Sequence, residues 1–240
     1  MMVQAVSISC TSIQKLTSEI GMGIRDCYSI ARSIMETALN VAYILASDIE
    51  VARRANRHAV QKSFRDLDRS GQVASWRFTL RANLDFEGEK KDEALAEALA
   101  EFSDAKGREV RDWTTDNIDA RVRSIEKISN RAALYFAGAI MTIYRHSSEI
   151  LHGTNFGVRF FWTGGMRVPR TKQDAEFNFL SSHFTTVFTS VIFSVRGLLE
   201  IIYKRFDLQD MTQALELFDK DFNDYFENSY LHLQPTAVSQ

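Results

Sequence analysis

RDCYSIARSIMETALNVAYILAS, residues 25–47, is the stretch of sequence that decides the fold. Its apolar side chains recur every three or four residues, at Ile30, Ile34, Met35, Ala38, Leu39, Ala42 and Leu45. This spacing places them on one wide face of an α-helix, and such a face has to be buried against other elements. We therefore expect a core helix here, with the remaining helices packed around it.

The same spacing extends over most of the chain on both sides of this segment. Helices are expected at residues 4–20, 48–68, 92–103, 117–129, 131–151, 171–206 and 211–230. Thr115 and Asp116 are candidate caps for the helix at 117–129, because short polar side chains satisfy the free N–H groups of a first turn. The pattern predicts an all-α protein.

Proline is scarce, with only 2 in the chain. Because proline interrupts helices, its scarcity favours long ones. The predicted architecture is a single all-α domain over residues 1–240, a bundle of long antiparallel helices. We expect a peripheral insertion at 70–115 and a frayed tail at 231–240.

The segment 153–170 differs from its surroundings, since it contains four glycines, one proline and many bulky aromatic or β-branched residues. This composition predicts an irregular loop or a short hairpin. Its three arginines, Arg159, Arg167 and Arg170, are accompanied by aromatic side chains and by no acidic residue. Such a mixture suits single-stranded RNA, and equally a loop packed on the core or at a subunit interface.

Composition sets limits on location and partners. The formal net charge is −2, so no global basic field draws the chain to nucleic acid or to an anionic membrane. The most apolar stretch, 184–195, ends at Arg196 and is shorter than the ~20 residues of a membrane span. We expect a cytoplasmic protein without a signal peptide, in which Cys10 and Cys27 are reduced thiols rather than a disulfide.

The candidate site is YRHSSEILHG, residues 144–153, where a helical run stops at a glycine. On a continuous helix His152 returns to within about 20° of Arg145, ~10.5 Å further along the axis. Glu149 lies between them on the same face. A guanidinium fits a phosphate and an imidazole can move a proton near neutral pH, so the pair could bind and cleave a phosphodiester. The alternative is structural: an Arg145–Glu149 pair, and a His-Gly helix end.

A second polar stripe, Arg32, Glu36 and Asn40, lies on the otherwise apolar core helix. Charges on a buried helix must be paired. Glu36 could orient Arg145 or His152 across a helix–helix contact, or it could simply pair with Arg32.

Metal sites find little support. Glu149-x-x-His152 has the spacing of one ligand pair in a di-iron bundle, but a di-iron site needs a second such pair, and the sequence has none. We expect neither a metal nor another cofactor, and a metal-binding helical bundle is the weakest alternative.

Arg145-x6-His152 on a late helix of an all-α domain resembles the Arg-x4–6-His signature of the HEPN superfamily, with His146 as the polar residue after the arginine. The helices at 32–40 and 144–153 are also similar to a bacterial domain family of unknown function. The resemblance covers roughly residues 25–50 and 131–206. HEPN members include metal-independent ribonucleases of defence and toxin–antitoxin systems that work as dimers. The resemblance implies that Arg145 holds the phosphate, that His152 is the acid/base and that His146 supports them.

The leading hypothesis is therefore a cytoplasmic, homodimeric, metal-independent endoribonuclease of phage defence or stress response. It would act on RNA through the ribose 2′-hydroxyl and would be accompanied by a cognate antitoxin or partner protein. The alternative from another class is a non-catalytic helical module that binds a partner protein or a small ligand.

Overall fold

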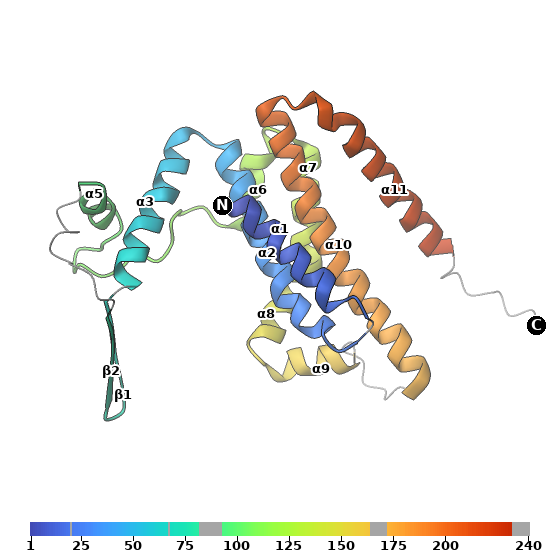
Figure 1. Cartoon of the computed structure of the whole chain (residues 1–240), viewed down its shortest axis with the longest axis horizontal. Helices are drawn as coiled ribbons and strands as arrows, with labels where there is room; N and C mark the ends of the chain where they lie inside the picture. The colour runs from blue at the N-terminus through green and yellow to red at the C-terminus, as the bar shows by residue number, and fades with distance from the viewer. Residues whose placement is uncertain (20, 67, 82–92, 164–171, 232–240) are drawn as a thin grey trace, which may run out of the picture.

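The computed structural model describes residues 1–19, 21–66, 68–81, 93–163 and 172–231, and these residues are mostly helical, as the sequence predicts (Figure 1). The elements are α1 (Met2–Leu16), α2 (Ile24–Ala46), α3 (Ile49–Asp66), β1 (Asp68–Val73), β2 (Trp76–Arg81), α5 (Glu93–Glu101), α6 (Ile118–Glu126), α7 (Asn130–Ala139), η1 (Ile140–Tyr144), α8 (Arg145–Leu151), α9 (Asn155–Thr163), α10 (Lys172–Phe206), η2 (Gln209–Met211) and α11 (Thr212–Leu231). Of the expected frayed tail, residue 231 is the last of α11, and residues 232–240 lie outside the described residues.

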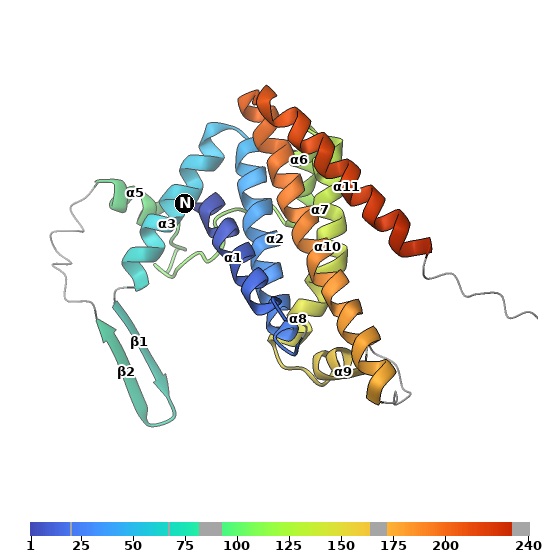
Figure 2. The ribbon, with the colours of Figure 1, turned by 45° about the vertical axis from the view of Figure 1, so that its right-hand side comes forward.

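Helix α2 is the centre of the bundle, as its apolar period predicts. Its most extensive contacts are with α10 and α1, and α6 and α8 also contact it (Figure 2). Ile34, Met35 and Leu39 are at most 1% exposed. Burying side chains of this size contributes about 1.5–3 kcal/mol each, so this face stabilises the whole bundle.

The helix expected at 131–151 is present but is not uniform. α7, η1 and α8 follow one another without a break, and η1 is a π-helical turn. In this turn the Thr142 hydroxyl donates to the carbonyl oxygens of Gly138 and Ala139, both at 3.0 Å. A π-turn accommodates an extra residue in the helix, and such turns are frequent at functional sites. This one ends immediately before Arg145.

Two local predictions were wrong. Residues 155–163 of the expected loop or hairpin form helix α9, and residues 164–170 lie outside the described residues. Within α9 the buried positions are Gly157 and Phe161, four residues apart, so its aromatic run follows a helical period. The cap of α6 is Asn117, whose side-chain oxygen accepts from the Ala120 N–H at 2.9 Å.

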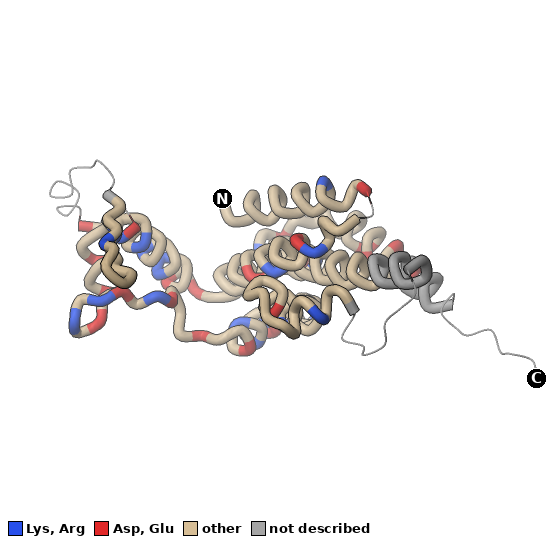
Figure 3. Tube along the Cα trace, turned by 90° about the horizontal axis from the view of Figure 1, so that it is seen from below, with Lys and Arg blue, Asp and Glu red and all other residues tan. Residues whose placement is uncertain are grey.

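Helix α3, the β1–β2 hairpin and α5 lie together on one side of the bundle (Figures 1 and 2). α5 packs against α3, and Phe102, just after α5, is fully buried. Charges of both signs gather here (Figure 3). They are largely paired: Arg57 contacts Glu50 at 2.6 Å and Glu101 at 2.5 Å.

Helix α10 joins the core to α11 through a buried ionic cluster. Arg196 is 2% exposed, and it donates to both carboxylate oxygens of Asp219 in α11, each at 2.8 Å. It also donates to Glu200 at 3.0 Å. The Tyr135 hydroxyl donates to Asp219 at 2.9 Å. Every carboxylate here has a cation within reach, as burial requires.

Within the described residues, one segment of α10, Ser182–Phe206, is long and apolar enough to cross a membrane by length and composition alone. Core helices of globular proteins pass the same test, and this segment packs against α2 and α7 and carries the buried Arg196. Cys10 and Cys27 are both free thiols, partly and fully buried respectively.

Candidate functional site

Helix α8 carries Arg145 and His152 at the surface, and α8 and α9 lie together at one end of the bundle (Figure 1). Both residues are exposed, and neither has a side-chain hydrogen bond or ion pair in the described part of the chain. The helix is continuous from Arg145 to Leu151, with His152 as its C-cap in α conformation. The two side chains therefore share one face about two turns apart, as the sequence predicts.

Glu149 does not pair with Arg145, contrary to the structural alternative for this segment. Its carboxylate instead accepts a hydrogen bond of 2.5 Å from the Thr154 hydroxyl. The same hydroxyl accepts from the Gly157 N–H at 3.0 Å, which caps the first turn of α9. Glu149 thus fixes the connection between α8 and α9, and Arg145 keeps its five N–H donors available for a ligand.

The helix end itself is as predicted. Gly153 has φ +61°, a left-handed conformation that glycine adopts without strain. The Thr154 N–H donates to the Glu149 carbonyl and the Gly153 N–H to the Ile150 carbonyl, both at 3.2 Å. This pattern is a Schellman motif, which ends α8 and fixes the backbone at His152.

Helix α9 crosses α8 at very short range because Gly157 has no side chain. A Cβ at that position would lie 2.2 Å from the Glu149 carbonyl oxygen, which is far inside van der Waals contact. This approach lets the Phe160 ring stack on His146, with centroids 4.1 Å apart and planes 3° apart. The packing of α9 thus sets the position of α8.

His146 is consequently turned towards α9 rather than towards the Arg145–His152 face. Its Nδ1 is buried and has no hydrogen-bond partner. Burial lowers the pKa of His146, and the neighbouring Arg145 cation lowers it further. At neutral pH His146 is therefore an uncharged packing residue, and any support it gives the site acts through the position of α8.

The polar stripe on α2, Arg32, Glu36 and Asn40, forms no hydrogen bond or ion pair with Arg145 or His152 in the described residues. Arg32 donates to Glu36 at 2.8 Å and its guanidinium lies over the Tyr144 ring, 4.6 Å from the centroid. The internal Arg32–Glu36 pair is thus the arrangement present, and Glu36 is not a partner of Arg145 or His152. Asn40 accepts from Arg121 of α6 at 2.7 Å. The stripe joins α2 to η1 and α6, and only Arg32 comes close to the candidate site, through Tyr144.

The basic residues expected in the loop are only partly visible. Arg159 is exposed on α9. Arg167 and Arg170 lie outside the described residues. In the part of the chain that the structure describes, no three His, Cys, Asp or Glu side chains gather as metal ligands, so Glu149 and His152 have no companion ligands there.

A chain of hydrogen bonds through His183 lies beneath the site and joins three helices. His183 of α10 is buried, its Nε2 lies 3.0 Å from the Phe161 carbonyl oxygen of α9, and its Nδ1 lies 2.6 Å from the Tyr28 hydroxyl of α2. A carbonyl can only accept, so Nε2 carries the proton and Nδ1 accepts from Tyr28. Burial lowers the pKa of His183, which keeps the ring neutral. This chain ties α9 to the core.

Within the described residues, the site presents a guanidinium without an ion-pair partner and an accessible imidazole, on one face of a helix whose position is set by its packing against α9. Such a face can bind an anion and exchange a proton with it.

Comparison with known proteins gives one result. A model of a protein family described as a family of unknown function, DUF5677, matches residues 2–164, from α1 to the residue after α9. No curated protein and no solved structure matches the chain. The matched range includes the core helix, the hairpin and the whole Arg145–His152 segment, and the chain belongs to the DUF5677 family.

Proposed function

We propose that this protein is a metal-independent endoribonuclease of the HEPN type, working in a defence or toxin–antitoxin system. The observation that carries the proposal is that Arg145 and His152 share an exposed face without a partner in the described residues, although a carboxylate stands on the same helix. A structural arginine would be expected to use Glu149, and Glu149 instead bonds Thr154. The Arg145-x6-His152 spacing, which resembles the HEPN signature, supports the same function.

The chemistry needs only these two side chains. The Arg145 guanidinium holds the non-bridging oxygens of a phosphodiester and stabilises the negative charge that develops on them. The His152 imidazole takes the proton of the ribose 2′-hydroxyl, whose oxygen then bonds to phosphorus while the bond to the 5′-oxygen breaks. The imidazolium returns the proton to that leaving oxygen. The products are a 2′,3′-cyclic phosphate and a 5′-hydroxyl, with no net redox change.

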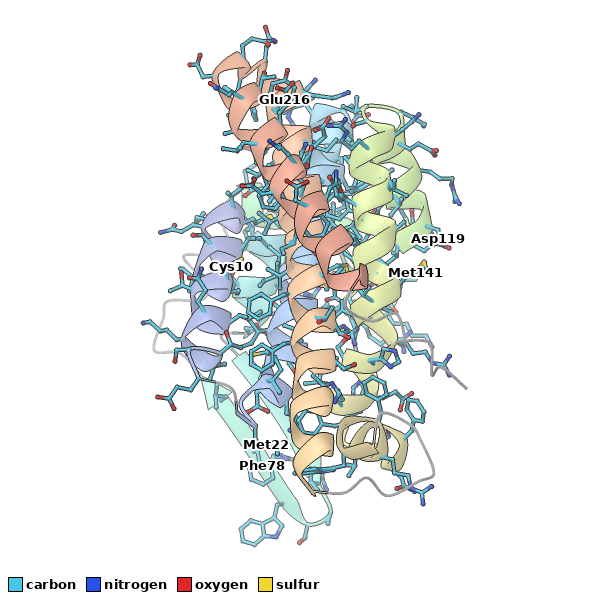
Figure 4. The ribbon with its side chains drawn as sticks, turned by 90° about the vertical axis from the view of Figure 1, so that its right-hand side faces the viewer. Cys10, Met22, Phe78, Asp119, Met141 and Glu216 are labelled. Atoms are coloured by element: carbon cyan, nitrogen blue, oxygen red, sulfur yellow. The ribbon has the colours of Figure 1, made fainter. Side chains whose placement is uncertain are left out.

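The active form in this proposal is a homodimer. Leu134 of α7 and Met141 of η1 are 74% and 82% exposed, on the helix that continues into α8. Met141 points away from the bundle (Figure 4). A second copy packed on this surface would cover both side chains and bring two Arg145–His152 pairs to one cleft. Sedimentation of a Leu134→Gln, Met141→Gln double variant should show a monomer where the wild type shows a dimer.

The direct test is RNA cleavage in EDTA. Wild type should cut single-stranded RNA, and Arg145→Ala and His152→Ala should each lose at least about 100-fold in rate. Glu36→Gln serves as the matched control, because Glu36 pairs with Arg32 on α2. Equal cleavage by wild type and both alanine variants, or none by wild type, would reject the proposal.

A second candidate uses the same residues without catalysis. The Arg145 guanidinium, which has no ion-pair partner in the described residues, lies on a helix whose last residue, Leu151, is 56% exposed. This combination also suits a carboxylate-bearing partner protein such as an antitoxin. This function predicts a complex that Arg145→Ala disrupts and RNA that stays intact under every condition.

A further inference from the structure

The β1–β2 hairpin has one strongly apolar face. The register pairs Val73 with Trp76, Gly71 with Phe78 and Arg69 with Leu80. Because side chains alternate between the two faces of a strand, these six residues share one face. The opposite face carries the pairs Ser70–Thr79 and Gln72–Arg77. The hairpin is therefore amphipathic.

This apolar face is uncovered. Val73, Trp76, Phe78 and Leu80 are 69%, 70%, 59% and 70% exposed. The hairpin extends away from the bundle in both ribbon views (Figures 1 and 2). A contiguous exposed apolar face of this kind marks an interaction surface. An isolated two-stranded hairpin is also only marginally stable, so a bound partner would stabilise it.

Charge indicates the kind of partner. The hairpin contains Arg69, Arg77 and Arg81 against one acid, Asp68, a net charge of +2, whereas the whole chain carries −2. Arg69 is paired with Asp66 of α3 at 2.9 Å, as Lys62 of α3 is with Glu109 at 3.0 Å. Arg77 has no ion-pair partner among the described residues. Two copies meeting through their hairpins would bring two positively charged segments together, whereas a polyanion would be attracted.

The spacing of the two rings favours a single-stranded nucleic acid over a duplex. Trp76 and Phe78 are two residues apart on β2, so their Cα atoms are about 6.8 Å apart. This is twice the ~3.4 Å rise of a stacked nucleic-acid strand. Neighbouring bases reach both rings only when the strand is extended and unstacked, which single strands allow and duplexes resist. Aromatic side chains beside arginine are the usual means of holding such strands.

We propose that the β1–β2 hairpin binds single-stranded RNA, with bases stacked on Trp76 and Phe78 of its apolar face. Arg77 starts on the opposite face, and its long side chain would reach the phosphates around the edge of β2. The choice of RNA rests on the proposed function, whereas the stacking surface itself does not. The hairpin would hold substrate at a distance from the Arg145–His152 site, so that a strand bound at both places is presented to α8.

The test is binding of a fluorescein-labelled 2′-O-methyl oligouridylate, which lacks the attacking hydroxyl and cannot be cut by the proposed reaction. Anisotropy should show about tenfold weaker binding for Trp76→Ala and for Phe78→Ala. Trp76→Phe should restore most of the affinity, and Thr79→Ala, on the opposite face, should match wild type. Arg77→Ala should weaken binding and lower the salt dependence by about one charge.

Three results would overturn the proposal. One is oligonucleotide binding that is absent or unaffected by the two ring variants. Another is a wild-type dimer that Trp76→Ala converts to a monomer, which would make the partner a second copy. The third is ring-dependent binding to phosphatidylserine vesicles without binding to the oligonucleotide. Loss of cleavage in Arg145→Ala with intact anisotropy separates the α8 site from the hairpin, so either proposal can fail alone.

Discussion

Two arginines of the bundle, Arg196 and Arg145, show how differently the same side chain can be used. Arg196 is 2% exposed and donates to both oxygens of Asp219 and to Glu200. Arg145 is exposed and has no such partner in the described residues, although Glu149 is one helical turn away. Burial forces pairing, so the contacts of Arg196 account fully for its presence. Nothing within the described structure accounts for Arg145, and we infer that its partner is a ligand.

The largest loss of stability should come from disrupting the ionic cluster around Arg196. Asp219→Ala leaves the Arg196 charge buried beside Glu200 alone, and should lower the free energy of unfolding by about 3–5 kcal/mol. Urea denaturation would measure this. Asp221→Ala, an exposed carboxylate on the same helix, should change the free energy by less than about 0.5 kcal/mol. Similar small losses in both variants would mean that the Arg196 cluster does not hold α11.

The next largest loss of stability is expected where α9 crosses α8. Gly157→Ala places a Cβ against the Glu149 carbonyl, so α9 must move, at a cost of about 1–3 kcal/mol in unfolding free energy. Because α9 sets the position of α8, RNA cleavage should fall as well. Gly71→Ala, where a Cβ meets nothing within 4 Å, is the control for stability. Unchanged stability and cleavage in Gly157→Ala would show that the close crossing is not needed.

Acid should lower the stability of the fold through His183, which contacts α9. The pKa of His183 in the folded chain lies below its ordinary 6.5, because burial disfavours the imidazolium, whereas the Phe161 carbonyl partly offsets this and His146 lowers it further. The unfolded chain therefore binds the proton more strongly, and stability falls as the pH drops below about 6.5 until the folded-state pKa is reached. The slope is about 1.4 kcal/mol per pH unit.

Urea denaturation of wild type and His183→Gln at pH 7.5 and 5.0 would measure this slope. The variant should be less stable at pH 7.5, because it disturbs the contacts with Tyr28 and Phe161, and should lose less on acidification. A variant with the wild-type pH dependence would assign the effect to another group, of which the nearest is His146.

The smallest effect on stability is expected for Arg145→Ala. Since the side chain is exposed and unpaired in the described structure, its removal should change the free energy of unfolding by less than about 0.5 kcal/mol. Thermal or urea denaturation would measure it alongside activity. A loss above 1 kcal/mol would show that Arg145 has a structural partner, which would weaken the contrast with Arg196.

Interactions local in sequence were the ones that could be predicted. The apolar period of α2, the Arg32–Glu36 pair and the glycine end at Gly153 all depend on residues within one or two turns. Three- and four-residue spacings carry that information directly. The same reasoning gave the common face of Arg145 and His152.

Interactions between distant segments could not be predicted from one sequence. Tyr28 and His183 are 155 positions apart, and Asn40 and Arg121 are 81 apart. Their pairing depends on how α2 packs against α10 and α6. The fold also turned the aromatic run 156–162 into a helix, because the contact of Gly157 with α8 outweighed the strand preference of its neighbours.

The β1–β2 hairpin was not predicted from the sequence, for a different reason. Residues 76–81 alternate apolar and polar side chains, as a strand should. The turn, however, is formed by Ala74 and Ser75, and Ala74 has φ +53°. Turns of this kind usually contain Asn or Gly, so the usual turn signal is missing from the sequence.

We propose that Arg145 and His152 form a site for RNA chemistry rather than a helix end alone. The most direct measurement compares one single-stranded RNA with its fully 2′-deoxy counterpart in EDTA, with analysis of the product ends. Wild type should cut only the RNA, leaving 2′,3′-cyclic phosphate, and Arg145→Ala and His152→Ala should be folded but inactive. Cleavage of the 2′-deoxy strand, or RNA cleavage that survives both substitutions, would contradict it.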